Sequence, residues 1–146
     1  MRKIIILTFM LIMVLPAVFV QGYDLLGAGN IYLEDLELQD RAVLLFWTTW
    51  CPYCRTSVKE FSDICGQLTA KGYSTYFVNV GEKKPRVSSF AERAGISCPI
   101  LFDYEGELAD RYKILGIPTY IFLDSGQVIN RANFISVSYV EKIYGK

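Results

Sequence analysis

The chain has 146 residues, of which 52% are hydrophobic and 14% aromatic, so it can form one domain with its own core and needs no cysteine framework. Fifteen basic residues balance fifteen acidic ones, which leaves no excess positive charge to attract nucleic acid. Histidine is absent, which excludes Cys-His and Ser-His catalysis and most mixed-ligand zinc and copper sites.

The N-terminus has the pattern of a secretory signal. Arg2 and Lys3 precede an apolar run at residues 4–15, and a small-residue stretch then ends near Gly22. The apolar segment is slightly shorter than the roughly 20 residues that span a bilayer. We therefore expect residues 1–22 to be a cleaved signal peptide or an N-terminal membrane anchor, and residues 23–146 to form the domain. The domain would then be exported to the periplasm or another extracytoplasmic compartment, where thiols are oxidised unless something keeps them reduced.

From residue 23 onward, the apolar residues alternate between strand-like and helix-like spacing. The continuous apolar run at residues 42–47 is typical of a strand that is buried on both faces. Behind it, apolar residues from Val58 to Leu68 recur at intervals of three and four, which predicts a helix that ends near Gly72. The later predicted elements are a strand at 73–80, a helix at 87–94, a strand at 99–102, a helix at 108–114, a strand at 119–123, a hairpin partner at 127–131 and a helix capped by Ser136. This order predicts an α/β domain with a mixed central sheet flanked by helices.

The sequence WCPYC at residues 50–54 lies where the first buried strand gives way to a helix. Cys51 is expected at the helix start, where unpaired backbone N–H groups and the helix dipole favour a thiolate. Pro52 suits the first turn, because the N–H it lacks has no partner there. Cys54 follows one turn later and is expected to be more buried. The spacing favours a redox pair.

Other uses of the cysteines stay open. A zinc site would need Cys65 and Cys98 as further ligands, and these are not paired at the usual spacing. A structural disulfide across a three-residue loop would remove little chain entropy. A Cu(I) metallochaperone is disfavoured by the absence of histidine and of methionine after Met13. We interpret Cys65 first as a small buried hydrophobe, while a Cys65 to Cys98 disulfide remains possible. No metal or other cofactor is expected beyond the redox-active cysteine pair itself.

WCPYC, followed by GIPT at residues 116–119, resembles the active-site pair and the cis-proline loop of the thioredoxin fold. The resemblance covers most of the chain from Ile31. It implies that the peptide bond before Pro118 is cis, that Pro118 lies against the cysteine pair, and that the backbone beside it pairs with an extended substrate segment. The residues that this resemblance assigns to substrate binding are Trp50, Pro52, Tyr53, Ile117 and Pro118.

Three further stretches are similar to exported thioredoxin-like proteins of the TlpA and ResA type. They are residues 31–36, an inserted helix and strand at residues 85–103 before the cis-proline, and the tripeptide at residues 80–82. The last similarity implies that Glu82 lies near the cysteines and shapes their proton uptake. The alternative for Glu82 is a solvated loop carboxylate within a solvated basic cluster, residues 83–86. Leu45 occupies the position of the buried aspartate of cytoplasmic thioredoxin, so Glu82 is the one nearby acid that the sequence suggests.

Together, these similarities predict an exported thiol-disulfide oxidoreductase that reduces protein disulfides. Cys51 would attack the substrate disulfide and Cys54 would resolve the mixed disulfide, so Cys51, Cys54 and Glu82 are the predicted catalytic residues. Apocytochrome c is among the implied substrates, in cytochrome c maturation, and a membrane protein would supply electrons. The open alternatives are a thioredoxin-like oxidant or peroxide-reducing protein and, less favoured, the Cu(I) metallochaperone.

Overall fold

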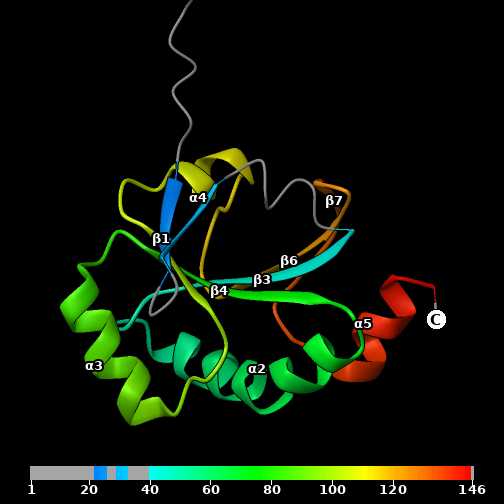
Figure 1. The fold of residues 1–146 in the computed structure, drawn as a ribbon, viewed down its shortest axis with the longest axis horizontal. Helices are drawn as coiled ribbons and strands as arrows, with labels where there is room; N and C mark the ends of the chain where they lie inside the picture. Colours follow the sequence, from blue (N-terminus) through cyan, green and yellow to red (C-terminus); the bar gives the residue numbers. More distant parts are fainter. Residues whose placement is uncertain (1–21, 26–28, 33–39, 146) are drawn as a thin grey trace, which may run out of the picture.

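The computed structural model describes residues 22–25, 29–32 and 40–145, and Figure 1 shows their arrangement. The predicted signal or anchor at residues 1–22 lies outside the described residues except for Gly22, and most of residues 31–36 does too. Within the part of the chain that the structure describes, no helix is long and apolar enough to cross a membrane.

A seven-stranded mixed sheet forms the middle of the domain. In chain order its strands are β1 (Gly22–Leu25), β2 (Gly29–Tyr32), β3 (Arg41–Trp47), β4 (Ser74–Val80), β5 (Ile100–Asp103), β6 (Thr119–Asp124) and β7 (Gln127–Ala132). Their order across the sheet is β2-β1-β5-β4-β3-β6-β7. Strands β3, β4 and β5 are parallel, while β1, β2, β6 and β7 pair with their neighbours in antiparallel fashion. The mixed sheet is as predicted, although the sequence patterns missed β1 and β2.

Helices cover both faces of this sheet (Figure 1). One face carries α2 (Pro52–Ala70), α3 (Lys84–Ala94) and α5 (Val137–Ile143), and the other carries the short α4 (Glu107–Arg111). Strand β3 serves both layers, because Val43, Leu45 and Trp47 pack in the cluster under α2 whereas its alternate residues pack in the cluster under α4. The alternation follows from the two-residue period of a strand, and it explains why residues 42–47 are apolar without interruption.

The predicted helices and strands are confirmed with small differences at their ends. Gly95 ends α3 in the left-handed conformation with a φ of 67°, and the hydroxyl of Ser136 caps α5 by accepting from the Tyr139 N–H at 3.1 Å. Helix α4 is shorter than predicted, because Lys113 takes a φ of 50° and the chain leaves the helical path before Ile114.

Cys65 and Cys98 form a disulfide that joins α2 to the segment before β5. The interpretation of Cys65 as a free hydrophobe is therefore wrong, although its place in the core was predicted, since it is fully buried. The two cysteines are 33 residues apart, and the loop that they close contains β4, Glu82 and α3. The inserted helix is thus tied covalently to the helix that carries the WCPYC motif.

Removing this disulfide should lower the free energy of unfolding by about 3–4 kcal/mol, because a cross-link that closes a loop of 33 residues restricts the unfolded chain. Urea denaturation of the oxidised protein would measure the loss in Cys65→Ala/Cys98→Ser. The single variant Cys98→Ser breaks the same bond but leaves Cys65 in the core, so it separates the loss of the cross-link from the loss of packing. An unchanged unfolding midpoint in both variants would contradict the expectation.

Candidate active site

Cys51 sits at the junction between β3 and α2. It is the N-cap residue of α2, and its Sγ accepts a hydrogen bond from the Cys54 backbone N–H at 3.2 Å. Pro52 begins the helix, as predicted. The Tyr120 hydroxyl donates to the Ser57 carbonyl at 2.9 Å and so fixes the first turns of α2 to β6. The sulfur of Cys51 therefore faces the first-turn N–H groups of a long, well-anchored helix, which are donors suited to an anion.

Both cysteines are buried, and Cys54 is the more deeply buried of the two. It has no exposed surface, whereas Cys51 is 4% exposed, and neither cysteine is in a disulfide. The pKa of the Cys54 thiol is raised to about 12, chiefly by burial and next by the hydrogen bond with Cys51. The charge of Glu82 acts in the same direction, while a backbone hydrogen bond with Thr48 opposes it. Cys54 is thus held as a neutral thiol beneath a sulfur that reaches the surface.

The loop before β6 comes close to this pair. The Ile117–Pro118 peptide bond is cis, which confirms the expectation for Pro118. The loop approaches the reactive sulfur through the Ile117 carbonyl oxygen, 4.0 Å from Cys51 Sγ. The Thr119 hydroxyl donates to the Gly116 carbonyl at 2.7 Å and closes the loop on itself.

A groove of about 650 Å³ runs along this loop and the first turns of α2. Its lining residues are Tyr53, Thr56, Ser57, Glu60, Gly116, Ile117, Pro118, Thr119, Asn133 and Phe134. Of the five residues predicted to bind substrate, Tyr53, Ile117 and Pro118 line this groove. Trp50 lies outside the lining but is 61% exposed beside Cys51, and Pro52 is also exposed. The structure therefore places an open groove with both polar and apolar lining residues beside the loop that approaches Cys51.

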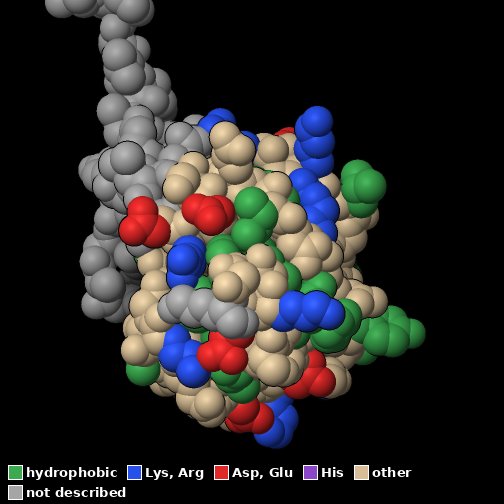
Figure 2. Space-filling model, turned by 90° about the vertical axis from the view of Figure 1, so that its right-hand side faces the viewer, with side chains coloured by type: hydrophobic (Ala, Val, Ile, Leu, Met, Phe, Trp, Pro, Cys, Tyr) green, Lys and Arg blue, Asp and Glu red, His purple; other side chains and the backbone are tan. Residues whose placement is uncertain are grey.

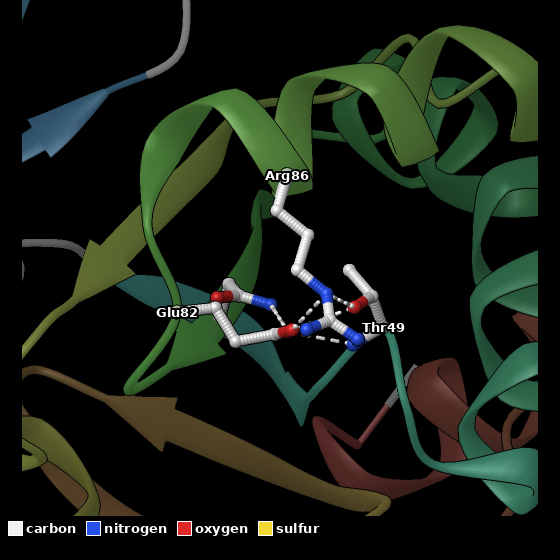
Figure 3. Close-up of polar contacts among 4 residues, drawn as sticks. Thr49, Glu82 and Arg86 are labelled. Atoms are coloured by element: carbon white, nitrogen blue, oxygen red, sulfur yellow. Dashed lines mark hydrogen bonds and ion pairs between the residues drawn. The ribbon is translucent and has the colours of Figure 1, made fainter.

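Glu82 is buried directly after β4, with only 8% of its surface exposed, so its interpretation as a solvated loop carboxylate is wrong. Figure 3 shows its carboxylate between Thr49 and Arg86. The Arg86 side chain extends toward it from α3. Oε2 accepts from the Thr49 backbone N–H at 2.6 Å and from Asn79 Nδ2 at 2.8 Å. Oε1 accepts from the Thr49 hydroxyl at 2.6 Å and lies 3.3 Å from Arg86 Nε, which also donates to that hydroxyl at 3.0 Å.

These bonds attach Glu82 to the backbone of the loop that carries Cys51. Glu82 reaches the cysteines through its charge on Cys54, while its hydrogen bonds go to Thr49, Asn79 and Arg86. None of these three partners was predicted from the sequence. Asn79 is a fully buried polar residue inside a strand pattern, which could have indicated it. Arg86 was placed in a solvated basic cluster, and its side chain is indeed 64% exposed although its Nε is bonded.

Comparison with known proteins identifies the family. Residues 16–132 match the model of the AhpC/TSA family. The chain belongs to this family. It is 32% identical over 112 residues to thiol-disulfide oxidoreductase ResA of Halalkalibacterium halodurans, in a match that covers 70% of this chain and 64% of that protein. It is 30% identical over 152 residues to thiol-disulfide oxidoreductase ResA of Bacillus subtilis, covering 88% of this chain and 83% of that protein.

The match to the Halalkalibacterium halodurans protein thus spans just under two thirds of the length of that protein. Among solved structures, StoA from Bacillus subtilis superposes with a TM-score of 0.72 at 22% identity, over 86% of this chain and 96% of that one. The superposition confirms the thioredoxin-like fold, and the ResA relatives confirm the predicted resemblance. The described residues of this family member bring together no group of three or more Cys, Asp or Glu side chains that could hold a metal ion.

Cys54 should stay protonated well above the pH at which ordinary thiols titrate. In Cys51→Ala it is the only free thiol, and its burial, the largest cause of the raised pKa, is retained. Because a raised pKa means that the neutral form persists to higher pH, the ultraviolet absorbance of the thiolate should stay flat through about pH 8.5, the ordinary cysteine value. Unfolding the variant in denaturant should restore ordinary titration. A thiolate signal near that pH in the folded variant would contradict the assignment.

Proposed function

We propose that this chain is an exported thiol-disulfide oxidoreductase that reduces protein disulfides through Cys51 and Cys54. The observation that carries the proposal is the asymmetry of the pair. Cys51 reaches the surface at a helix N-terminus, and Cys54 is a buried neutral thiol one turn away. The ResA relatives and the cis peptide bond before Pro118 support the same function.

The reaction follows from this asymmetry. The Cys51 thiolate attacks one sulfur of the substrate disulfide, which forms a Cys51–substrate bond, breaks the substrate S–S bond and releases one substrate sulfur as a thiolate that takes up a proton. Cys54 then loses its proton and attacks Cys51 Sγ. The second substrate sulfur leaves, and a Cys51–Cys54 disulfide remains. Two electrons have passed from the cysteine pair to the substrate.

Glu82 is proposed to assist the step in which Cys54 loses its proton. Its charge is one of the influences that raise the pKa of Cys54, so a proton on Glu82 would favour the Cys54 thiolate. The negative charges of a Cys54 thiolate and of the Glu82 carboxylate therefore oppose each other. The contacts with Thr49 and Arg86 hold the carboxylate where this coupling operates.

The compartment and the partners complete the proposal. Residues 1–22 are proposed as a signal peptide or membrane anchor, followed by the thioredoxin-like domain at 23–146. The Cys65–Cys98 disulfide supports export, because such bonds form and persist in oxidising compartments. There the cysteine pair would need a membrane electron donor to work as a reductant, and we propose disulfide-bearing proteins, apocytochrome c among them, as substrates.

The equilibrium potential of the Cys51–Cys54 pair against glutathione decides the direction of electron flow. A value near the thioredoxin end of the range, about −270 mV, supports the reductase, whereas a value near −120 mV supports an oxidant. Rapid consumption of peroxide would support the peroxide-reducing alternative. Tight Cu(I) binding without disulfide exchange would support the metallochaperone.

The two cysteines should differ when each is replaced. Cys51→Ser should abolish disulfide reduction, because no accessible thiolate remains to attack. Cys54→Ser should accumulate a mixed disulfide with substrate, because the resolving thiol is missing. Mass spectrometry of the reaction with a disulfide-bearing protein measures both outcomes. Equal trapping by the two variants would contradict the assigned roles.

Glu82→Gln should simplify the pH dependence of Cys51 alkylation, with Cys54 titrating at lower pH because a charge that raises its pKa is removed. The amide can keep the contacts made by Oε2 and loses the ion pair with Arg86. Alkylation rates across the pH range, followed by peptide mass spectrometry, test this.

Glu92→Gln is the matched control, since Glu92 is exposed on α3 and the same charge is lost there. Its alkylation profile should equal that of the wild type. An unchanged profile in Glu82→Gln as well would remove Glu82 from the proton chemistry and leave it as a structural tie of the active-site loop.

A further inference from the structure

A second groove of about 610 Å³ adjoins the groove beside Pro118. The two share Gly116, Thr119 and Asn133 as lining residues, so they lie next to each other at the cis-proline loop. The second groove is lined in addition by Lys113, Ile114, Leu115, Arg131 and Ala132. A chain segment that lay across Pro118 to reach Cys51 would extend into both parts.

The two parts carry opposite charge. Glu60 is the one charged residue that lines the first groove, whereas Lys113 and Arg131 line the second, which has no acidic residue. Both basic side chains are exposed, and among the described residues neither has a recorded ion pair. Figure 2 shows one face of the molecule, on which Lys, Arg, Asp and Glu side chains are all present.

The backbone fixes the positions of Lys113 and Arg131 in the second groove. Lys113 sits at the turn that ends α4, where the Ile114 N–H donates to the Ala109 carbonyl at 2.8 Å. Arg131 lies on β7, the last strand of the sheet order, opposite Ile121 of β6. An edge strand leaves backbone groups free to pair with an extended segment. Leu115, between them and the cis-proline loop, is fully exposed and offers an apolar contact.

We propose that the second groove is a specificity subsite for substrate proteins. The subsite binds acidic side chains of the substrate that lie a few residues from its target cysteine, on one side of that cysteine in the sequence. The inference rests on the proposed function, and it names the class of substrate. The occupant is an extended segment of a substrate protein, because only 4% of Cys51 is exposed and the substrate must bring its disulfide to the cis-proline loop. Charge complementarity selects acidic residues for the part lined by Lys113 and Arg131.

The test uses peptides that carry one cysteine in a mixed disulfide with a small chromophoric thiol. One set has aspartates on the N-terminal side of the cysteine, a second has them on the C-terminal side, and matched peptides have asparagine or lysine in their place. The second-order rate constant of the reduced full-length protein is measured with each. We expect one aspartate set to react about three- to tenfold faster than its asparagine match, the effect of two exposed ion pairs, and the lysine match to react more slowly.

Two double variants assign the effect to the groove. Lys113→Gln/Arg131→Gln should lose the preference and keep the wild-type rate with the asparagine peptides. Lys59→Gln/Arg93→Gln removes the same charge from α2 and α3 and should keep the preference. High salt should reduce the preference in the wild type, because exposed charges are screened.

The outcomes separate this inference from the proposed function. If the asparagine peptides react through Cys51 but neither aspartate set is faster, or if Lys113→Gln/Arg131→Gln keeps the preference, the subsite is overturned and the oxidoreductase stands. If no peptide reacts with the reduced protein, both proposals fall.

Discussion

Cys54 lies fully buried one turn behind Cys51, and the chemistry of the site depends on that burial. Burial keeps the Cys54 thiol neutral, so the sulfur at the helix N-terminus is the one able to attack. The same burial makes proton removal from Cys54 costly, which creates the need for a nearby group whose charge can change. A single feature of packing therefore distinguishes two chemically identical side chains, and the proposed role of Glu82 rests on it.

The sheet brings the other residues of the candidate site to one of its edges. Parallel β3 and β4 pair Trp47 with Asn79, so the loops that follow these strands lie side by side and Thr49 meets Glu82. Strand β6 is antiparallel to β3 and begins where β3 ends, which places the cis-proline loop against Cys51. Cys51, Glu82 and the cis-proline loop come from three separate segments of the chain. Their proximity is a property of the sheet order.

The sequence predicted those features of the structure that interactions between neighbouring residues determine. The cysteine pair at a helix start and the helix of residues 52–70 follow from spacing and helix-end chemistry, while the cis bond before Pro118 came from a family resemblance. The Cys65–Cys98 disulfide depended on a Cα–Cα distance of 6.4 Å between segments 33 residues apart, which spacing cannot give. Arg86 was missed for a similar reason, because its bonding partners come from two other loops.

The two cysteine pairs divide structural and chemical tasks. Cys65 is fully buried, so a thiolate in solution has no direct access to its sulfur, whereas Cys51 keeps 4% of its surface exposed. The Cys65–Cys98 bond also encloses the segment that carries Glu82 and Arg86 and ties it to α2. Because Glu82 acts on Cys54 through charge, which weakens with distance, its influence depends on that attachment as much as on its own hydrogen bonds.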